Sequence, residues 1–356
     1  MIELKVNGKS YTKFVDLELS RDIDNACGSL TFSTSKKKID VKANDVIQAV
    51  VDGVTMFTGR IDSPQTSEDE GDISQYFTAR DYLADLVDSS LPDSCKRFKT
   101  GTSLLTLINE VISALNMTLT VQNLAGTILP FDKTEKVAGE AGVNAFEFIT
   151  SYARKRQVFI NSNGQGNVKL YKLNGILGSN FNFENSGAKK NILSGSGQLD
   201  FSDRYHTYVC KSQINFKTAS GDAGDYNRMG KAVDDEIRNS RYYEFTSEQS
   251  MTQEECQNRA EEEANIRRAR SFSYTVTASG HSQDGTVFDI AKGARINDEV
   301  ADIKGVLMIK SFSMRVSESD GETTEMVMTY PDAYSVEASI AQKSQKRLDI
   351  NSYYSK

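Results

Sequence analysis

Histidine and cysteine side chains offer the most direct route to chemistry, and this sequence has few of either. Its 356 residues include two histidines, His206 and His281. A serine or cysteine nucleophile needs a histidine base beside it. His206 stands in RYHTYV, where a strand is expected to begin, and His281 stands in ASGHSQDG, where a turn is expected. Both positions favour a surface or capping role, so we predict no catalytic residue.

Metal and cofactor sites also lack a sequence motif. The cysteines are scattered and form no C-x-x-C pair, whereas structural zinc and redox sites use short paired spacings. The stretch NGQGN lacks the Lys-Ser/Thr ending of a phosphate loop. The acidic stretches SEDEGD and SESDGE are typical of solvated turns. We therefore predict no metal site and no cofactor. The cysteines in question are Cys27, Cys95, Cys210 and Cys256.

Composition and charge narrow the class of protein further. Hydrophobic residues make up 38% and charged residues 26%, the balance of a soluble protein with material for two to four domains. The net charge of -7 disfavours specific nucleic acid binding, because gripping a phosphate backbone needs a concentrated basic face. Dispersed thiols, no signal-peptide pattern and no apolar run of about 18 residues predict folding in a cytosol without membrane insertion.

Strand and helix patterns predict an α+β fold that is mainly antiparallel β. Short alternating runs with a turn at Asp52-Gly53 indicate a small β-barrel or β-sandwich near the start. GTSLLTLINEVISALNM and NAFEFITSYARKRQ have the apolar spacing of helices, with Thr102 or Ser103 and Asn144 as expected caps. A hairpin follows, which indicates an inserted α+β domain.

The predicted organisation is two similar small β-barrel domains, an inserted α+β helix-hairpin domain and a further α+β portion. In order, the segments are a first β-barrel at 1–92, the inserted α+β domain at 93–190, a crossover strand and long loop at 191–250, a helix plus second β-barrel at 251–335 and a C-terminal arm at 336–356.

The two ends of the chain have similar patterns, as expected of an internal repeat. Residues 44–81 and 297–332 can be aligned through their glycine and acidic turns. This alignment predicts that one β-element is built twice. The matched residues are Asn44-Asp45 with Asn297-Asp298, Gly53-Val54 with Gly305-Val306, Met56 with Met308, Ser67-Glu68 with Ser317-Glu318, Gly71 with Gly321, Thr78 with Thr329, and Asp81 with Asp332.

These segments resemble a known family. The stretch GTVFDIAKGARINDEVADIKGVLMIKSFSMRVSESDGETTEMVMTYPDAY is similar to the closing domain of baseplate hub proteins of Mu-like contractile-tailed phages. DVIQAVVDGVTMFTGRIDS is similar to their first barrel, and NAFEFITSYARKRQVFINSNGQGNVKLYK to their helix-hairpin unit. The family's usual Trp before the closing glycine turn is replaced in FDIAKG. Order and spacing carry the resemblance, which covers most of the chain.

The resemblance implies a structural protein of the virion tail baseplate, with no catalytic residues. Such hubs are homotrimeric rings that adapt the sixfold tail tube to the threefold central spike, so each chain would supply two similar β-barrels. The implied partners are two further copies, the spike, the tail tube and neighbouring baseplate proteins, with assembly in the host cytoplasm. An acidic channel wall would let DNA pass without sticking.

Two alternatives from other classes stay open. A tail-associated cell-wall glycan hydrolase would need two carboxylates across a cleft, and a receptor-binding adhesin would need aromatic residues clustered at loop tips. For the interface we predict Phe57 and Ile309 on the tube side, and Tyr353 and Tyr354 on the spike side. Core packing and a disordered terminus are the competing interpretations of these four residues.

Overall fold

The computed structural model describes residues 1–11, 14–35, 38–69, 72–131, 136–140, 142–173, 180–187, 190–212, 228–247, 251–330 and 334. Within these ranges the chain forms four α-helices, and its strands pair mostly antiparallel. The predicted α+β, mainly antiparallel class is therefore confirmed.

The first sheet unit comprises the strands that precede the first helix. They lie side by side in the order β3-β4-β7-β6-β5-β1-β2. The turn between β5 and β6 has positive φ at both Asp52 (47°) and Gly53 (85°), as the hairpin prediction required. The strands are β1 (Ile2–Val6), β2 (Lys9–Tyr11), β3 (Asp16–Asp22), β4 (Ser29–Ser35), β5 (Val46–Val51), β6 (Val54–Asp69) and β7 (Asp72–Asp81).

The helical unit follows and has its own hydrophobic core. The Ser103 side chain accepts the N–H of Thr106, and Asn144 accepts the N–H groups of Phe146 and Glu147, so both predicted helix caps are confirmed. The elements are α1 (Ala84–Asp88), a 3-10 turn (Asp93–Cys95), α2 (Leu104–Ala114), β8 (Val121–Asn123), α3 (Ala145–Arg154), β9 (Phe159–Ser162) and β10 (Val168–Tyr171).

The second sheet unit contains two strands that the sequence did not assign to it. Residues 181–184, predicted within the inserted segment, form β11, which pairs with β19. Residues 192–199, predicted as part of a crossover, pair with β16. The strands are β11 (Phe181–Glu184), β12 (Ile192–Leu199), β16 (Phe272–Ser279), β17 (Ser282–Gln283), β18 (Thr286–Val287), β19 (Gly293–Asp298), β20 (Ile303–Ser317) and β21 (Gly321–Thr329).

A third unit joins a small sheet to the longest helix. It consists of β13 (Thr207–Lys211), β14 (Met229–Val233), β15 (Tyr242–Thr246) and α4 (Gln253–Ser271), with strand order β14-β13-β15. Residues 229–233 therefore form a strand within the segment predicted as a crossover strand and long loop at 191–250, and residues 213–227 and 248–250 of that segment lie outside the described ranges. Thr252 and Glu255 form a capping box at the start of α4. Small side chains, such as Ala260 and Ala264, let the helix approach the sheet.

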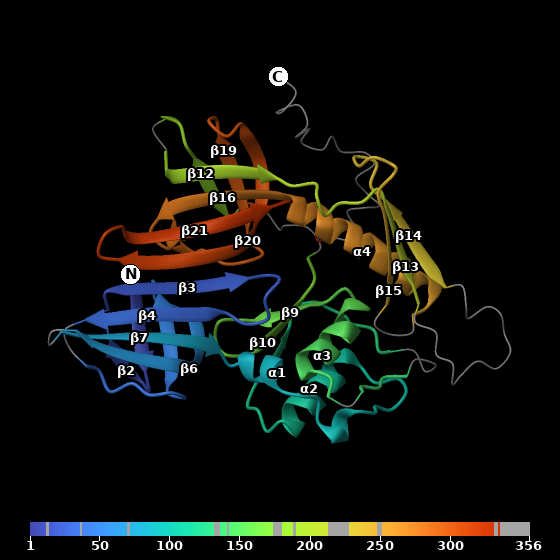
Figure 1. Cartoon of the computed structure of the whole chain (residues 1–356), viewed down its shortest axis with the longest axis horizontal. Coiled ribbons are helices and arrows are strands. Elements are labelled where there is room, and N and C mark those ends of the chain that lie inside the picture. The colour runs from blue at the N-terminus through green and yellow to red at the C-terminus, as the bar shows by residue number, and fades with distance from the viewer. Residues whose placement is uncertain are drawn as a thin grey trace.

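The two sheet units meet edge to edge through β3 and β20. These strands pair antiparallel from Asp16 opposite Ser317 to Asp22 opposite Ser311. One continuous sheet therefore joins strands that are about 300 residues apart in sequence, and the hydrophobic core continues from one unit into the other. In Figure 1 the first unit is blue and lies below the second unit, which is orange and red except for the green β11 and β12, with β3 and β20 adjacent.

The two sheet units repeat one order of strand pairing. The order β3-β4-β7-β6-β5-β1 corresponds to β12-β16-β21-β20-β19-β11. The long strands β6 and β20 are both bulged at the corresponding place, between Ile61 and Ser63 and between Ile309 and Ser311. The two sheet units differ at the last strand, because β11 is parallel to β19 whereas β1 is antiparallel to β5.

The residue matches that the sequence suggested are wrong in register. When the bulges are superposed, Arg60 corresponds to Met308, whereas the sequence alignment matched Met308 with Met56. Gly53 lies in the β5–β6 turn, but Gly305 lies inside β20, opposite Ile296. Glycine and acidic residues recur in many hairpin turns, so their identities placed the two segments a few residues out of step.

Candidate assembly surface

Eight strands from the two sheet units form one continuous wall, in the order β12-β16-β21-β20-β3-β4-β7-β6. Successive side chains in a strand point to opposite faces of a sheet. In this eight-stranded wall one face is apolar and buried. Leu17, for example, lies opposite Phe32 on β4 and Val316 on β20. The other face, which we call the polar face, carries the remaining side chains.

Hydroxyl side chains make up most of the polar face. Six carboxyl groups accompany them, together with three arginines, Arg60, Arg80 and Arg315. The carboxyl groups belong to Asp16, Glu18, Asp22, Asp69, Asp72 and Glu325. The serines and threonines include Ser20, Ser29, Thr31, Ser33, Ser63, Ser67, Ser74, Thr78, Ser194, Ser196, Thr275, Thr277, Ser311, Ser313, Ser317 and Thr323.

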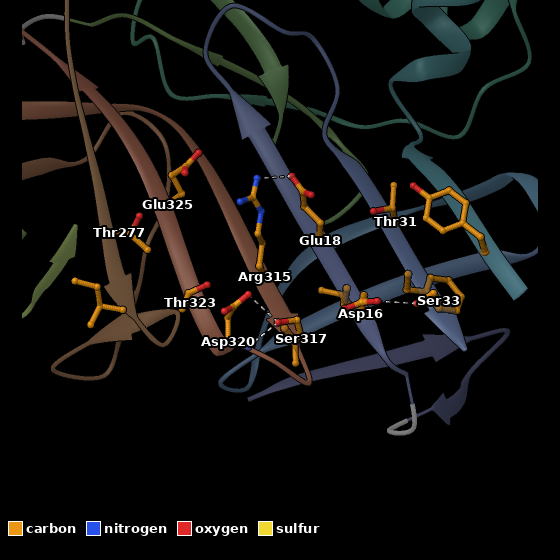
Figure 2. Close-up of a pocket in the computed structure, with 15 residues that line it drawn as sticks. Asp16, Glu18, Thr31, Ser33, Thr277, Arg315, Ser317, Asp320, Thr323 and Glu325 are labelled. Atoms are coloured by element: carbon orange, nitrogen blue, oxygen red, sulfur yellow. Dashed lines mark hydrogen bonds and ion pairs between the residues drawn. The ribbon is translucent and has the colours of Figure 1, made fainter. Parts of the chain in front are cut away.

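The middle of the polar face is hollowed. A depression of about 630 Å³ is lined by both sheet units, from Tyr76 on β7 to Leu193 on β12. The wall therefore curves toward its polar side. Figure 2 shows Arg315 reaching toward Glu18 across the β20–β3 seam, where their side-chain atoms lie 3.5 Å apart. Ser313 donates to Glu18 over 2.7 Å. Such groups offer hydrogen bonds and weak negative charge, but no nucleophile paired with a base.

Both ends of the wall are open edges within the described residues. β5 pairs with one edge of β6 only as far as Arg60. The backbone of Ile61 forms two further hydrogen bonds on that edge, to the backbone of Asn44 and of Asp45. From residue 62 to 69 the described ladder pairs β6 with β7 alone. At the other end, β12 pairs with β16 alone. An open edge presents backbone N–H and C=O groups that another strand can bind.

Of the four predicted interface residues, two can be located. Phe57 is 1% exposed and Ile309 is 0% exposed, so both side chains lie in the hydrophobic core of the chain. A partner on these hairpins would meet the neighbouring backbone and other side chains. Tyr353 and Tyr354 lie outside the described residues. The tube-side and spike-side assignments stay predictions.

The two histidines lie just outside strands of separate sheets, and each has a threonine partner. Nδ1 of His206 lies 3.0 Å from Oγ1 of Thr207, at the start of β13. Nδ1 of His281 lies 3.0 Å from Oγ1 of Thr324, and burial lowers the pKa of this imidazole. Among the described residues, no group of three or more His, Cys, Asp and Glu side chains could hold a metal ion. No described helix has the length and apolarity to cross a membrane.

Sequence reasoning missed the open edge at β12. Its sequence, ILSGSGQL, lacks the apolar alternation that marks a strand. Alternation is absent because Gly195 and Gly197 occupy the core-side positions, where a Cβ on Gly195 would lie 2.6 Å from the hydroxyl of Tyr274. The serine-glycine repeat could have indicated this strand. Serines suit a polar face, and glycines in a strand suit positions where other side chains lie close to its backbone.

Known proteins share this fold. Residues 1–81 match the family described as Mu phage baseplate assembly protein GpP-like, N-terminal. A tail protein from Neisseria meningitidis MC58 is 17% identical with a TM-score of 0.80, covering 95% of this chain and 98% of that one. The 43 kDa tail protein of prophage MuSo2 from Shewanella oneidensis is 20% identical with a TM-score of 0.77, covering 94% and 98%. No curated protein matches the sequence.

A more distant structure extends the likeness. A component of the E. coli type VI secretion system, described as similar to the T4 bacteriophage tail proteins gp27 and gp5, is 8% identical. Its TM-score is 0.58, with 93% of this chain and 78% of that chain covered. The predicted resemblance to baseplate hub proteins of Mu-like phages is confirmed, since residues 1–81 match the GpP-like family model and the chain shares the fold of phage tail proteins.

Proposed function

We propose that this chain, whose first 81 residues match the GpP-like baseplate family, is the structural hub of a contractile phage tail baseplate. Three copies form a ring that adapts the sixfold tail tube to the threefold central spike. The repeated order of strand pairing in the two sheet units carries this proposal. A chain that presents one element twice lets three copies offer six similar surfaces to a sixfold partner.

In this proposal the two sheet units are the two small barrels, and the helical unit is the inserted domain. The first barrel is the segment predicted at 1–92. The second is the segment predicted at 251–335, to which β11 and β12 contribute strands from earlier in the chain. The wall made by both barrels faces the axis of the ring, because it is concave on its polar side.

The polar face suits the wall of a channel through which DNA passes. Its carboxyl groups outnumber its arginines, and its remaining groups are mainly small hydroxyls. Affinity for DNA depends on cationic groups that displace counterions from phosphates. A face without such a cluster repels the DNA duplex or does not bind it. The partners in this proposal are two further copies, the spike, the tail tube and neighbouring baseplate proteins, and the chain performs no catalysis.

The test is the mass of the purified full-length chain in solution, measured by light scattering over a range of concentrations. We expect three times the mass of one chain, and electron microscopy should then show rings with a central opening. A stable monomer would overturn the ring. Lytic activity of that monomer on purified cell wall would replace the hub with the hydrolase alternative.

A further inference from the structure

We propose that Cys210 and Cys256 form a dithiol that can be oxidised to a disulfide, which would tie α4 to the central strand of the third unit. All four cysteines of the chain are free thiols in this structure. The pair lies outside the eight-stranded wall, and its chemistry does not depend on the proposed ring.

The fold brings these two thiols together from the sheet and the helix of the third unit. Cys210 lies on β13, directly opposite Gly230 on β14, and residues opposite one another in a sheet direct their side chains to the same face. At Gly230 that face meets α4, because a Cβ there would lie 2.1 Å from the carbonyl oxygen of Cys256. The side chain of Cys210 therefore points toward the turn of the helix that contains Cys256.

The two thiols are buried and in contact. Each residue is 0% exposed, and a hydrogen bond joins the two side chains. The Cys256 thiol also donates to the carbonyl oxygen of Arg228 over 3.7 Å. Sulfur atoms that already touch need only a short movement to form a disulfide bond, whereas distant thiols would require the backbone to move.

Cys256 is the nucleophile of this pair. The hydrogen bond from Cys210 lowers the pKa of the Cys256 thiol. The nearby Arg228 guanidinium lowers this pKa too, against burial and the Glu255 carboxylate. Cys256 also stands near the N-terminus of α4, where the helix dipole favours a thiolate. The pKa of Cys210 is raised, first by its hydrogen bond to Cys256 and then by burial, so this thiol is the one that closes the disulfide.

The oxidant is a low-molecular-weight disulfide such as oxidised glutathione. The Cys256 thiolate attacks one sulfur of that disulfide, the S–S bond breaks, and one glutathione leaves as a thiolate that takes up a proton. Cys210 then loses its proton to solvent, and its sulfur attacks the Cys256 sulfur of the mixed disulfide. A second glutathione leaves, so two protein thiols are oxidised while one glutathione disulfide is reduced to two thiols. Because both cysteines are buried, the exchange proceeds in molecules whose third unit has opened locally.

Oxidation would stabilise a unit that has only a small core of its own. Five buried residues form that core, and three of them are alanines, so little apolar surface holds the unit together. A disulfide between residues 210 and 256 would close the chain through β14 and β15 and restrict the opened state. In the proposed function the chain folds in a reducing cytosol and acts after release from the cell. The pair would then be reduced during assembly and oxidised afterwards.

Peptide mapping after equilibration with glutathione tests the disulfide. The full-length chain is incubated in mixtures of reduced and oxidised glutathione, and a second sample is refolded from urea in the same mixtures. After alkylation and digestion with trypsin, we expect the peptides at 205–211 and 242–259 to be linked in both samples. If Cys210 and Cys256 stay alkylated in every mixture, or each carries its own glutathione, the dithiol is overturned. A link that forms only on refolding would overturn oxidation of the folded chain.

Two variants separate the disulfide from oxidation in general. Cys256→Ser replaces one sulfur by oxygen and should form no link. Cys27→Ser changes a half-buried thiol of the first sheet unit and should link as wild type does. Circular dichroism checks that both variants fold, and the map of the wild type decides by itself if one does not.

Hydrogen exchange measures what the disulfide does. In oxidised wild type, the amides of β13, β14 and β15 should exchange on the order of a hundredfold more slowly than in reduced wild type, because the cross-link restricts the opened state. The amides of the eight-stranded wall should exchange equally in both. Cys256→Ser should show no difference between the two conditions. Equal or faster exchange of the third unit in oxidised wild type would overturn the stabilising role.

Discussion

Asp81 is a carboxyl group buried where the first sheet unit meets the helical unit. It is 2% exposed, and it accepts the N–H of Gly28 over 2.6 Å and that of Leu83 over 3.0 Å. Burial raises its pKa to about 6 despite these hydrogen bonds and the nearby Arg21 guanidinium. The native state therefore holds a proton on Asp81 at mildly acidic pH, where the unfolded chain has already released it.

This carboxyl should make stability fall as pH rises between about 4 and 7. The native pKa is near 6 and the ordinary value is 3.8, so the native state binds more protons in this window and loses stability as they leave. Replacing Asp81 with Asn removes that dependence. The difference in free energy of unfolding between wild type and Asp81→Asn should shift in favour of the variant by on the order of 3 kcal/mol from pH 4 to pH 7.

Urea unfolding at several pH values measures this shift. Using the difference between two proteins cancels the other carboxyl groups, several of which titrate in the opposite sense because hydrogen bonds lower their pKa, as at Asp45. Asp85→Asn on the exposed side of α1 is the control and should run parallel to wild type. If Asp81→Asn also runs parallel to wild type, Asp81 is ionised throughout the window and the inference fails.

At the scale of elements, the sequence predicted what depends on neighbours in the chain. The Asp52-Gly53 turn and the caps at Ser103 and Asn144 are local features, and all are present. β11 and β12 were misplaced because their pairing depends on strands about 80 residues or more away. The seam between β3 and β20 has no local signal either, although it defines the candidate surface. The duplication could be detected from the sequence. Its register could not, because the register depends on the positions of two β-bulges, and no residue type indicates a bulge in the sequence.

The third unit depends on a close approach between β14 and α4. Gly230 on β14 faces the helix, and a Cβ there would clash with the backbone carbonyl of Cys256. Backbone cannot move aside as a flexible side chain can, so Gly230→Ala must push the strand from the helix. We expect a loss of about 1–3 kcal/mol in stability, as for other overpacked sites.

Hydrogen exchange of backbone amides locates this effect. Protection should fall in β13, β14 and β15 and persist in the eight-stranded wall, which lies away from this unit in Figure 1. Lys231→Ala, at the next and exposed position of β14, is the matched control. Unchanged protection in Gly230→Ala would mean that α4 and β14 do not pack as closely as described.

At the scale of the whole molecule, the polar face differs from an ordinary protein exterior because it has few long cationic side chains. It spans strands from both sheet units, yet the paired positions on it include only three arginines and no lysine. Long cationic side chains are common on exposed strands and are the groups that hold phosphate. Short hydroxyls leave the hollow open and give a passing polyanion little to bind. This arrangement is consistent with the proposed position of the wall around a channel.

Adding positive charge to this face should therefore convert the ring into a DNA-binding protein. Thr31→Lys with Glu325→Lys changes the charge of each chain by three units, at positions on β4 and β21 that line the hollow. We expect wild type not to retain duplex DNA at moderate salt. The variant should retain it with an affinity that falls steeply as salt rises, because binding releases counterions. Fluorescence anisotropy with labelled duplex, over a series of salt concentrations, measures both the affinity and its dependence on salt.

The variant Thr246→Lys with Glu254→Lys is the control. It makes the same charge change on exposed residues of the third unit and should bind DNA much more weakly. Equal binding by the two variants would show that total charge, and not the concave face, controls contact with DNA.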